Sequence, residues 1–377
     1  MNRLLSLQAH FQLDENKDYK NITRIFSSDK RAPTIRMSTM KALLLSRPDA
    51  SKPPVLTLGE VPRPEPQEGE LLIQVHASAI HPSDLLNSTG SFPLLSIPPG
   101  GNRIPGRDFS GTVISPSSHP LYNKPVFGTS GNTQGFTVSG AHAEFLSVPE
   151  NAVVEKPESL SWVQAATVGV PFSTAGLVLR RVGLGEVKDG KGGKEKEERE
   201  TVLVLGANGA VGAAVVQLAR ARGARVLEGV RSDKGDVNTA SDPSLSTLDT
   251  LTNGKGVDIV IDTVGSPALT SAAVSKLALR GRVVFIAAPR GGGADSVLGV
   301  KMTGFYRKEA SLFGVNSLLY GVGEMAGLLG EMRGLFERGV LKGTAEGSWN
   351  EVPLENGVEA YKLAGERGKG KFVLVMQ

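Results

Sequence analysis

The sequence predicts an α/β protein of two domains, in which a strand-rich domain precedes a doubly wound parallel sheet. Two observations support this prediction. Residues 201–290 alternate between apolar runs typical of strands, such as TVLVL and VDIVIDTV, and stretches with helical spacing, such as AAVVQLARA. That alternation builds a parallel sheet. Residues 40–165 consist of short apolar stretches separated by Pro and Gly, which is typical of strands joined by turns.

Length and composition limit the classes of protein to which the chain can belong. A chain of 377 residues is long enough for two domains that each bury most of their apolar surface. It contains no Cys, which excludes disulfides and metal sites built on thiolates. The net charge of +4 comes without a basic stripe between aromatic residues, so we expect no nucleic-acid partner. We expect no membrane span, because no run of about 18 apolar residues stands out.

Two segments are expected to lie outside the folded core. Residues 1–36 carry scattered charges without a sustained period, and their four acidic residues argue against an organelle presequence. We expect a disordered extension there, or an upstream start that is not used. The tract 185–200 is charged and of low complexity, so we expect a solvated surface loop. We expect a cytoplasmic protein, and residues 1–36 leave a mitochondrial location open.

A glycine-rich loop, GANGAVG, follows the first strand of the expected parallel sheet. Its three glycines permit a tight turn, a close approach of backbone to a ligand, and close packing of the next helix on the strand. The free N–H groups at the start of that helix favour an anion, which predicts a dinucleotide pyrophosphate. The spacing is GxxGxxG rather than GxGxxG, and a merely structural turn is the alternative. The predicted cofactor-binding residues of the loop are Gly206, Ala207, Asn208, Gly209, Ala210, Val211 and Gly212.

The end of the second strand predicts which dinucleotide is bound. An NAD site places an acidic residue there to hold the ribose 2′-hydroxyl, and a carboxylate would repel a 2′-phosphate. Val230 stands at this point and is followed by Arg231, Ser232 and Lys234, so we expect a cationic pocket and NADPH as cofactor. The alternative is that Glu228, two residues earlier, is the ribose ligand and Arg231 a solvated surface charge.

With these motifs the sequence resembles the medium-chain dehydrogenase/reductase superfamily over residues 40–377, and more narrowly its zinc-free quinone oxidoreductase and enoyl reductase branch. The motifs that carry the resemblance are VHASAIHPSDLLNSTG, IPGRDFSGTV, AHAEFLSVP, PFSTAGLVL, GANGAVG, GVDIVIDTVG, GRVVFIAAP and GKFVLVM. The resemblance implies a GroES-like, partly closed β-domain over residues 40–165, continued by 300–377, and a Rossmann domain over 166–299. It also implies a cleft between them for nicotinamide and substrate, and a homodimer.

The resemblance assigns further residues to the cofactor site. They are Thr174 near the nicotinamide ribose or the phosphates, Thr263 and Val264 near the adenosine half, Ala287 and Ala288 facing the nicotinamide, and Asn316 near the cleft. Each is otherwise an ordinary packing or turn residue.

The chain departs from the zinc-dependent members of this superfamily. Those members need a Cys in the first motif and His-Glu in the second as ligands. Here the two segments read HPSD and GRD, and Arg107 stands where a ligand would be, so we expect no metal site. The predicted catalytic residues are His81 as a proton donor, with Ser83 and Asp84 orienting substrate or cofactor. The alternative is that the HPSD segment caps a helix and that His81 is an ordinary core or surface residue.

These features predict an NADPH-dependent, zinc-independent oxidoreductase that transfers hydride to an electron-poor acceptor, either a quinone or an α,β-unsaturated carbonyl. Enoyl reductases of the mitochondrial fatty-acid type carry a Tyr proton donor shortly after the first motif, where this chain has Phe92. That favours quinones, whose reduced oxygens take protons from water. Two alternatives stay open: an enoyl-thioester or biosynthetic-pathway reductase, and a non-catalytic NADP-binding protein.

Overall fold

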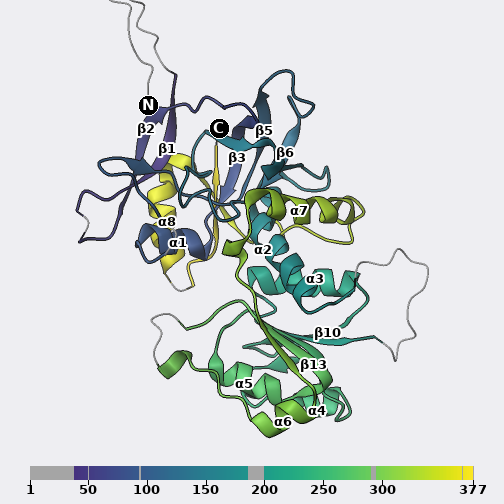
Figure 1. The fold of residues 1–377 in the computed structure, drawn as a ribbon. Coiled ribbons are helices and arrows are strands. Elements are labelled where there is room, and N and C mark those ends of the chain that lie inside the picture. The colour runs from purple at the N-terminus through teal and green to yellow at the C-terminus, as the bar shows by residue number, and fades with distance from the viewer. Residues whose placement is uncertain are drawn as a thin grey trace, which may run out of the picture. The chain divides into compact units, whose positions relative to one another are not determined.

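The fold of the chain is given by a computed structural model (Figure 1). It describes residues 38–49, 51–92, 95–185, 199–289, 294–366 and 368–376. The expected extension over residues 1–36 and most of the expected surface loop over 185–200 lie outside the described residues.

Six parallel strands form the sheet of the Rossmann domain. In sheet order they are β11 (Val237–Asn238), β10 (Arg225–Val230), β9 (Thr201–Leu205), β12 (Val257–Asp262), β13 (Leu277–Phe285) and β14 (Ser311–Gly314). The strand order reverses at β9, which has β10 on one side and β12 on the other. Such a reversal opens a crevice at the carboxyl ends of the strands, and the glycine-rich loop starts there. The doubly wound sheet predicted from the sequence is confirmed.

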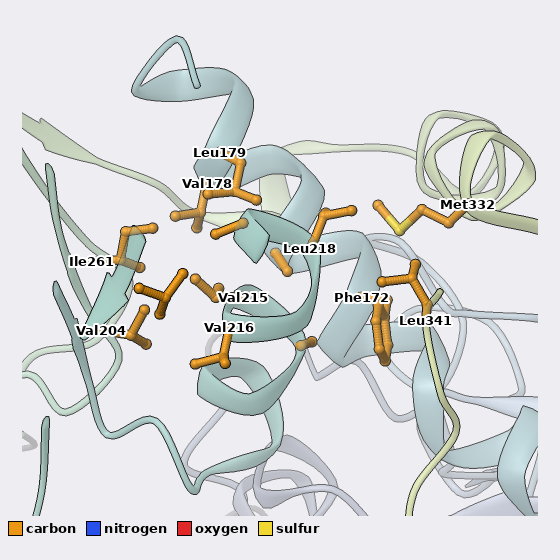
Figure 2. Close-up of a cluster of buried hydrophobic side chains, with 14 of the residues drawn as sticks. Phe172, Val178, Leu179, Val204, Val215, Val216, Leu218, Ile261, Met332 and Leu341 are labelled. Carbon is orange, nitrogen blue, oxygen red and sulfur yellow. The ribbon is translucent and has the colours of Figure 1, made fainter. Parts of the chain in front are cut away.

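Helices cover both faces of this sheet because its central strands are apolar on both sides. Alternate residues of β9 pack into different clusters, with Val202 and Val204 facing helices α2 and α3 and with Leu203 and Leu205 facing α4 and α5. These helices are α2 (Trp162–Arg181), α3 (Ala210–Ala221), α4 (Thr247–Leu251) and α5 (Pro267–Ser275). Figure 2 shows the first cluster, where Val204 of β9 lies beside Val215 of α3.

Helix α2 packs against both domains. It begins with a capping box, in which Ser161 Oγ accepts from the Gln164 backbone N–H at 3.1 Å and Gln164 Oε1 accepts from the Ser161 N–H at 2.9 Å.

By length and composition α2 is apolar enough to cross a membrane, which corrects the expectation that no such run is present. Of its most apolar 18-residue window, 78% is buried inside the protein, as in the core helix of a globular fold. It packs on α3 and on α7 (Val322–Glu337).

The first domain is built from two sheets. The larger has the order β15 (Asn350–Pro353), β16 (Phe372–Val375), β3 (Glu70–Ala79), β5 (Phe109–Ser115), β6 (Pro125–Gly128) and β8 (Val153–Glu155), and β7 (Phe145–Pro149) also pairs with β3. The smaller has the order β2 (Val55–Pro62), β1 (Thr39–Ser46) and β4 (Asn102–Arg103). The inward faces of β3, β5 and β7 form one apolar core. The GroES-like β-domain expected from the sequence is confirmed.

The Rossmann sheet extends beyond residue 299, the boundary expected from the sequence. Helix α6 (Met302–Arg307) leads into β14, which pairs in parallel with β13 from Ser311 to Gly314. This strand is only four residues long, too short for a sequence period to mark it as a strand. The chain then returns through α7 and α8 (Gly357–Gly365) to β16, which pairs antiparallel with β3.

Candidate functional site

The glycine-rich loop has the geometry that its sequence requires. Gly206 has a φ of 79°, in the left-handed region where residues with a side chain are strained. A Cβ atom at Gly212 would lie only 2.1 Å from the Gly206 carbonyl oxygen, so the first turn of α3 packs on the loop without room for a side chain. Gly209 is the N-cap of α3. The free N–H groups of the first turn of α3 therefore begin directly at the loop.

A cavity of about 390 Å³ lies between this loop and the first domain. The Rossmann domain and the segment after β14 line it with Gly209, Ala210, Val211, Gly212, Thr263, Ile286, Val315, Asn316, Ser317 and Leu318. The first domain lines it with His81, Pro82, Ser83, Phe92 and Arg107, and α2 with Val170, Pro171 and Thr174. We call it the nicotinamide cavity. It brings together predicted catalytic and cofactor-binding residues that lie more than 200 positions apart in the chain.

Thr174 contributes an unused hydroxyl group to the nicotinamide cavity. Its side chain is 5% exposed, and Oγ1 is buried without a hydrogen-bond partner among the described residues. Leaving a buried polar group unsatisfied costs about 1–3 kcal/mol. A bound ligand that offers an oxygen or a hydroxyl would remove this cost, so the geometry fits the cofactor role expected of Thr174.

A second cavity of about 480 Å³ lies on the other side of the glycine-rich loop. We call it the adenosine cavity. Gly206, Asn208, Val230, Arg231, Thr263 and Val264 are among its lining residues. Ser232 is half-buried and Lys234 exposed, and neither lines this cavity. The carboxylate of Glu228 lies 2.7 Å from Arg220 Nη2 of α3, so it is held by an ion pair on that helix. The acidic alternative for the ribose is therefore engaged elsewhere.

Besides Ser232 and Lys234, three predicted cofactor residues line neither cavity. Ala207 is buried in the core beneath the loop. Ala287 and Ala288 pack against Gly265, where an added Cβ would come within 2.5 Å of the Ala287 carbonyl carbon. Ile286, directly before them, lines the nicotinamide cavity instead. The sequence did not show that Ile286, rather than Ala287 and Ala288, would line the cavity.

The HPSD segment forms the start of helix α1 (Pro82–Ser88), with His81 as its N-cap. Asp84 is buried, does not line the nicotinamide cavity, and accepts the backbone N–H of His81 through Oδ2 at 2.8 Å. It therefore acts as the helix cap that was the alternative interpretation of this segment. Ser83 does line the cavity, and its Oγ accepts a hydrogen bond from Arg107 Nη1 at 3.1 Å.

His81 is paired with a residue that the sequence did not single out. Its Nε2 lies 2.8 Å from Oδ2 of Asp108, and both side chains are buried. The Asp108 carboxylate also accepts the backbone N–H of Val170 in α2, at 2.7 and 3.0 Å. Asp108 thus joins α1, β5 and α2 at the floor of the nicotinamide cavity.

Arg107 is a second residue of the cavity to which the sequence assigned no functional role, since it was noted only as standing where a zinc ligand would be. Its Nε donates to Ser130 Oγ at 2.7 Å, and the guanidinium lies 5.1 Å from the ring centroid of Phe136. Burial lowers the pKa of Arg107 below its ordinary value, and the carboxylates of Asp84 and Asp108 oppose this effect. An arginine remains charged at neutral pH. The GRD motif contains an arginine at a position where zinc-dependent members have a ligand, but only the fold shows that Arg107 reaches the cavity.

A zinc ion does not fit the residues at this place. Catalytic zinc needs three protein ligands and one open position. Here the carboxylate of Asp108 is taken up by His81 and the Val170 amide, and the Arg107 cation shares the cavity. Across the described ranges, no three His, Asp or Glu side chains gather closely enough to hold a metal ion.

Comparison with known proteins gives consistent matches over both domains. An alcohol dehydrogenase GroES-like domain model matches residues 67–158, and a zinc-binding dehydrogenase model matches residues 210–332. A zinc-type alcohol dehydrogenase-like protein of Schizosaccharomyces pombe is 42% identical over 340 residues, which cover 89% of this chain and 97% of the relative. A quinone oxidoreductase of Rattus norvegicus is 28% identical over 341 residues, covering 86% and 94%.

Solved structures agree with this match. The crystal structure of an alcohol dehydrogenase superfamily protein from Novosphingobium aromaticivorans superposes with a TM-score of 0.72 at 26% identity. The superposition covers 90% of this chain and 100% of that one. Both domains and the order of their elements are therefore shared with that protein.

Proposed function

Because the chain belongs to the medium-chain dehydrogenase/reductase superfamily, whose members use a nicotinamide cofactor, we propose that it is an NADPH-dependent, zinc-independent oxidoreductase. Its acceptor is a quinone or an α,β-unsaturated carbonyl. The observation that carries the proposal is the nicotinamide cavity, in which the start of α3 and the unpartnered hydroxyl of Thr174 meet Ser83 and Arg107. The name of the rat relative, a quinone oxidoreductase, supports the acceptor class.

The glycine-rich loop and Thr174 would hold the cofactor. The backbone N–H groups at the start of α3 suit the pyrophosphate, and the adenosine cavity beyond Gly206 suits the adenosine half. Thr174 Oγ1 would bond a ribose or phosphate oxygen in the nicotinamide cavity. When bound, the reduced nicotinamide supplies the hydride. The chain supplies orientation and a site from which bulk water is largely excluded.

The choice of NADPH rests on the end of β10. Arg231 lines the adenosine cavity, and no ion pair of its side chain is found among the described residues. A guanidinium is suited to a 2′-phosphate because it can bond two phosphate oxygens at once. Glu228 would favour the free ribose hydroxyl of NADH, but its carboxylate pairs with Arg220.

The acceptor proposal rests on Phe92. Phe92 lines the nicotinamide cavity and stacks on Phe136 with ring centroids 4.7 Å apart. A flat aromatic wall suits a planar quinone or a conjugated enone, since offset stacking on aromatic rings is favourable. A phenyl ring has no proton to donate, so Phe92 does not supply the proton that completes the reduction.

Two measurements test this function. Steady-state consumption of NADPH with a panel of quinones and enones measures turnover, and a fluorescence titration measures NADPH binding. Turnover with a quinone or enone supports the proposal. Tight NADPH binding without turnover on any acceptor would instead indicate a non-catalytic binding protein. A crotonyl thioester reduced far faster than every quinone and enone would indicate an enoyl-thioester reductase.

We also propose a homodimer that forms through β14. This strand ends the Rossmann sheet, and none of the described strands pairs with its outer edge. Leu312 on β14 is 39% exposed and Leu279 on β13 is 67% exposed. An open apolar edge favours pairing with a second copy. Light scattering should give a dimer for the wild type and a monomer for Leu312→Lys; a monomeric wild type would contradict the proposal.

A further inference from the structure

The nicotinamide cavity contains a buried cation that has no carboxylate partner among the described residues. Arg107 is 4% exposed, and no Asp or Glu oxygen of the described residues lies within 4.0 Å of its guanidinium. Burying an unpaired charge is costly, and buried arginines normally bind a carboxylate. Asp84 and Asp108 act on Arg107 only at longer range. This arrangement leaves a place for negative charge directly at the guanidinium.

The hydrogen bonds of Arg107 leave two donors unused. A guanidinium has five N–H groups. Nε donates to Ser130 Oγ at 2.7 Å, Nη1 to Ser83 Oγ at 3.1 Å, and Nη2 to the Gly131 carbonyl at a long 3.5 Å. No acceptor in the described part of the chain takes the other two N–H groups. They belong to a side chain that lines the nicotinamide cavity.

Ser83 is positioned to act together with Arg107. Its oxygen accepts from Arg107, so its own hydroxyl hydrogen remains free to donate. Ser83 also lines the nicotinamide cavity, as do Thr174 and Phe92. The contact of Arg107 with Phe136 and its bond to Ser130 hold the guanidinium in one place. Two neighbouring donors on rigid supports are the usual parts of a site that stabilises an oxyanion.

We propose that Arg107 and the Ser83 hydroxyl bind the carbonyl oxygen of the acceptor and stabilise the negative charge that hydride transfer places on it. This inference rests on the proposed function. With an enone, the β-carbon accepts the hydride and forms a new C–H bond. The C=C electron pair shifts to the bond between the α-carbon and the carbonyl carbon, and the C=O pair moves to oxygen, giving an enolate. A proton from water then adds to the α-carbon, and the oxidised nicotinamide leaves.

The substrate class follows from this assignment. The acceptor must carry a carbonyl oxygen that is bonded to, or conjugated with, the carbon that receives the hydride, since only then does negative charge reach an oxygen at Arg107. Quinones and enones meet this condition, whereas an isolated alkene does not. A carboxylate that is already anionic would bind Arg107 as an inhibitor rather than as a better substrate, because stabilisation that is equal before and during the reaction does not raise kcat.

The test compares Arg107→Met, Arg107→Lys and Ser83→Ala with the wild type, using NADPH and an enone. Arg107→Met should lower kcat about 100- to 1,000-fold, and Ser83→Ala should lower it less. Arg107→Lys, which keeps the charge, should restore part of the loss. The dissociation constant of NADPH should change less than about threefold in all three variants. Arg103→Met, which removes an arginine of β4 whose Nε donates to the Ser96 carbonyl, should keep wild-type kinetics.

A measurement on the unmodified protein covers the case in which Arg107→Met fails to fold. The complex with NADP⁺ is titrated with 4-nitrophenol, whose phenolate absorbs visible light. A nearby cation typically lowers the pKa of an acid by about 1–3 units, so the bound phenol should ionise at lower pH than the free phenol. An unchanged or raised pKa, or no binding of the phenolate, would overturn the assignment of Arg107.

The outcomes separate this inference from the proposed function. If the wild type neither binds NADPH nor reduces any acceptor, the proposed function is wrong. If the wild type reduces the enone and Arg107→Met retains its kcat, the function stands and the oxyanion role of Arg107 is wrong. If Arg107→Met instead loses NADPH binding and kcat in parallel, Arg107 serves the cofactor and not the acceptor.

Discussion

Nε2 of His81 lies 2.8 Å from Oδ2 of Asp108, and the same carboxylate accepts the backbone N–H of Val170. The buried Asp108 side chain thus contacts His81 at the start of α1 and Val170 in α2. It packs closely there, since a Cβ added at Gly169 would lie 2.7 Å from the carboxylate. Asp108 is therefore a structural centre of the cavity floor and holds His81 in a single orientation.

Removing the Asp108 carboxylate should destabilise the protein. In Asp108→Ala the Val170 N–H loses its acceptor and His81 loses its partner, both in the interior. Leaving a buried polar group without a hydrogen-bond partner costs about 1–3 kcal/mol, and two such groups are left, so the free energy of unfolding in denaturant should fall by about 2–6 kcal/mol. Asp108→Asn keeps an oxygen for Val170 and should lose clearly less. Equal stability of Asp108→Ala and the wild type would contradict this role.

Arg231 should determine the preference between the two dinucleotides. Hydrogen bonds to charged groups contribute about 1.5–3 kcal/mol each, so the wild type should prefer NADPH to NADH by about ten to several hundred fold in kcat/KM. Arg231→Ala should raise the KM for NADPH and leave that for NADH nearly unchanged, because only the phosphate differs. Adding Val230→Asp should shift the enzyme further towards NADH. A parallel loss with both cofactors would show that Arg231 does not contact the phosphate.

Gly209 should be required for both dinucleotides equally. It lines both cavities at the N-cap of α3, so a side chain there occupies the space expected for the pyrophosphate that NADPH and NADH share. Gly209→Val should weaken the binding of both cofactors in fluorescence titrations. Gly327→Val is a matched control, since a Cβ at Gly327 in α7 has no atom within 4 Å. That control should bind both cofactors like the wild type, and a Gly209→Val protein with normal binding would refute the loop's role.

Stability should fall below pH 6.5 because His142 is buried in its neutral form. Its Nε2 lies 3.1 Å from the Ala79 carbonyl, which can only accept, and its Nδ1 lies 2.9 Å from the Tyr361 hydroxyl. Burial lowers the pKa of His142 below its ordinary value of 6.5. The unfolded chain therefore binds a proton there as the pH falls below 6.5, while the folded chain does not, and folding is disfavoured.

Denaturant unfolding at two pH values measures this effect. Between pH 6.5 and 5.5 the wild type should lose up to about 1 kcal/mol more than His142→Gln, which carries no titratable group at that position. Carboxylates that titrate in the same range affect both proteins alike, so the difference isolates His142. Identical pH dependence of the two proteins would show that folding does not lower the pKa of His142.

The sequence correctly predicted those elements that are specified by residues close together in the chain. The strand, glycine loop and helix around Gly206 follow from apolar runs and from glycines at fixed spacing, and the structure has them where they were expected. The short strand β14 was not assigned to the Rossmann sheet, because four residues carry no readable period. The burial of α2 was also not evident, since its apolar residues contact both domains and surround the helix on most sides.

The candidate site was predicted only in part, because some of its residues act through contacts between distant parts of the chain. Ser83 and Thr174 were singled out by motif, and both line the nicotinamide cavity. The roles of Arg107 and Asp108 depend on contacts with Ser130 and Val170, which lie 23 and 62 positions further along the chain. No spacing rule connects such residues. Only the packing of β5 against α2 brings them to the cavity.

Transfer of deuterium from NADPH to an enone is the most direct measurement of the proposed hydride transfer. The protein is incubated with an enone and with NADPH that carries deuterium at C4 of the nicotinamide, in separate samples for each face of the ring, and the product is analysed by mass spectrometry and NMR. An NADPH-dependent reductase should place one deuterium at the former β-carbon from one of the two labelled cofactors, and should react much more slowly with NADH. Saturated product without deuterium from either sample, or no product although NADPH binds, would show that the protein does not transfer hydride from NADPH to the enone.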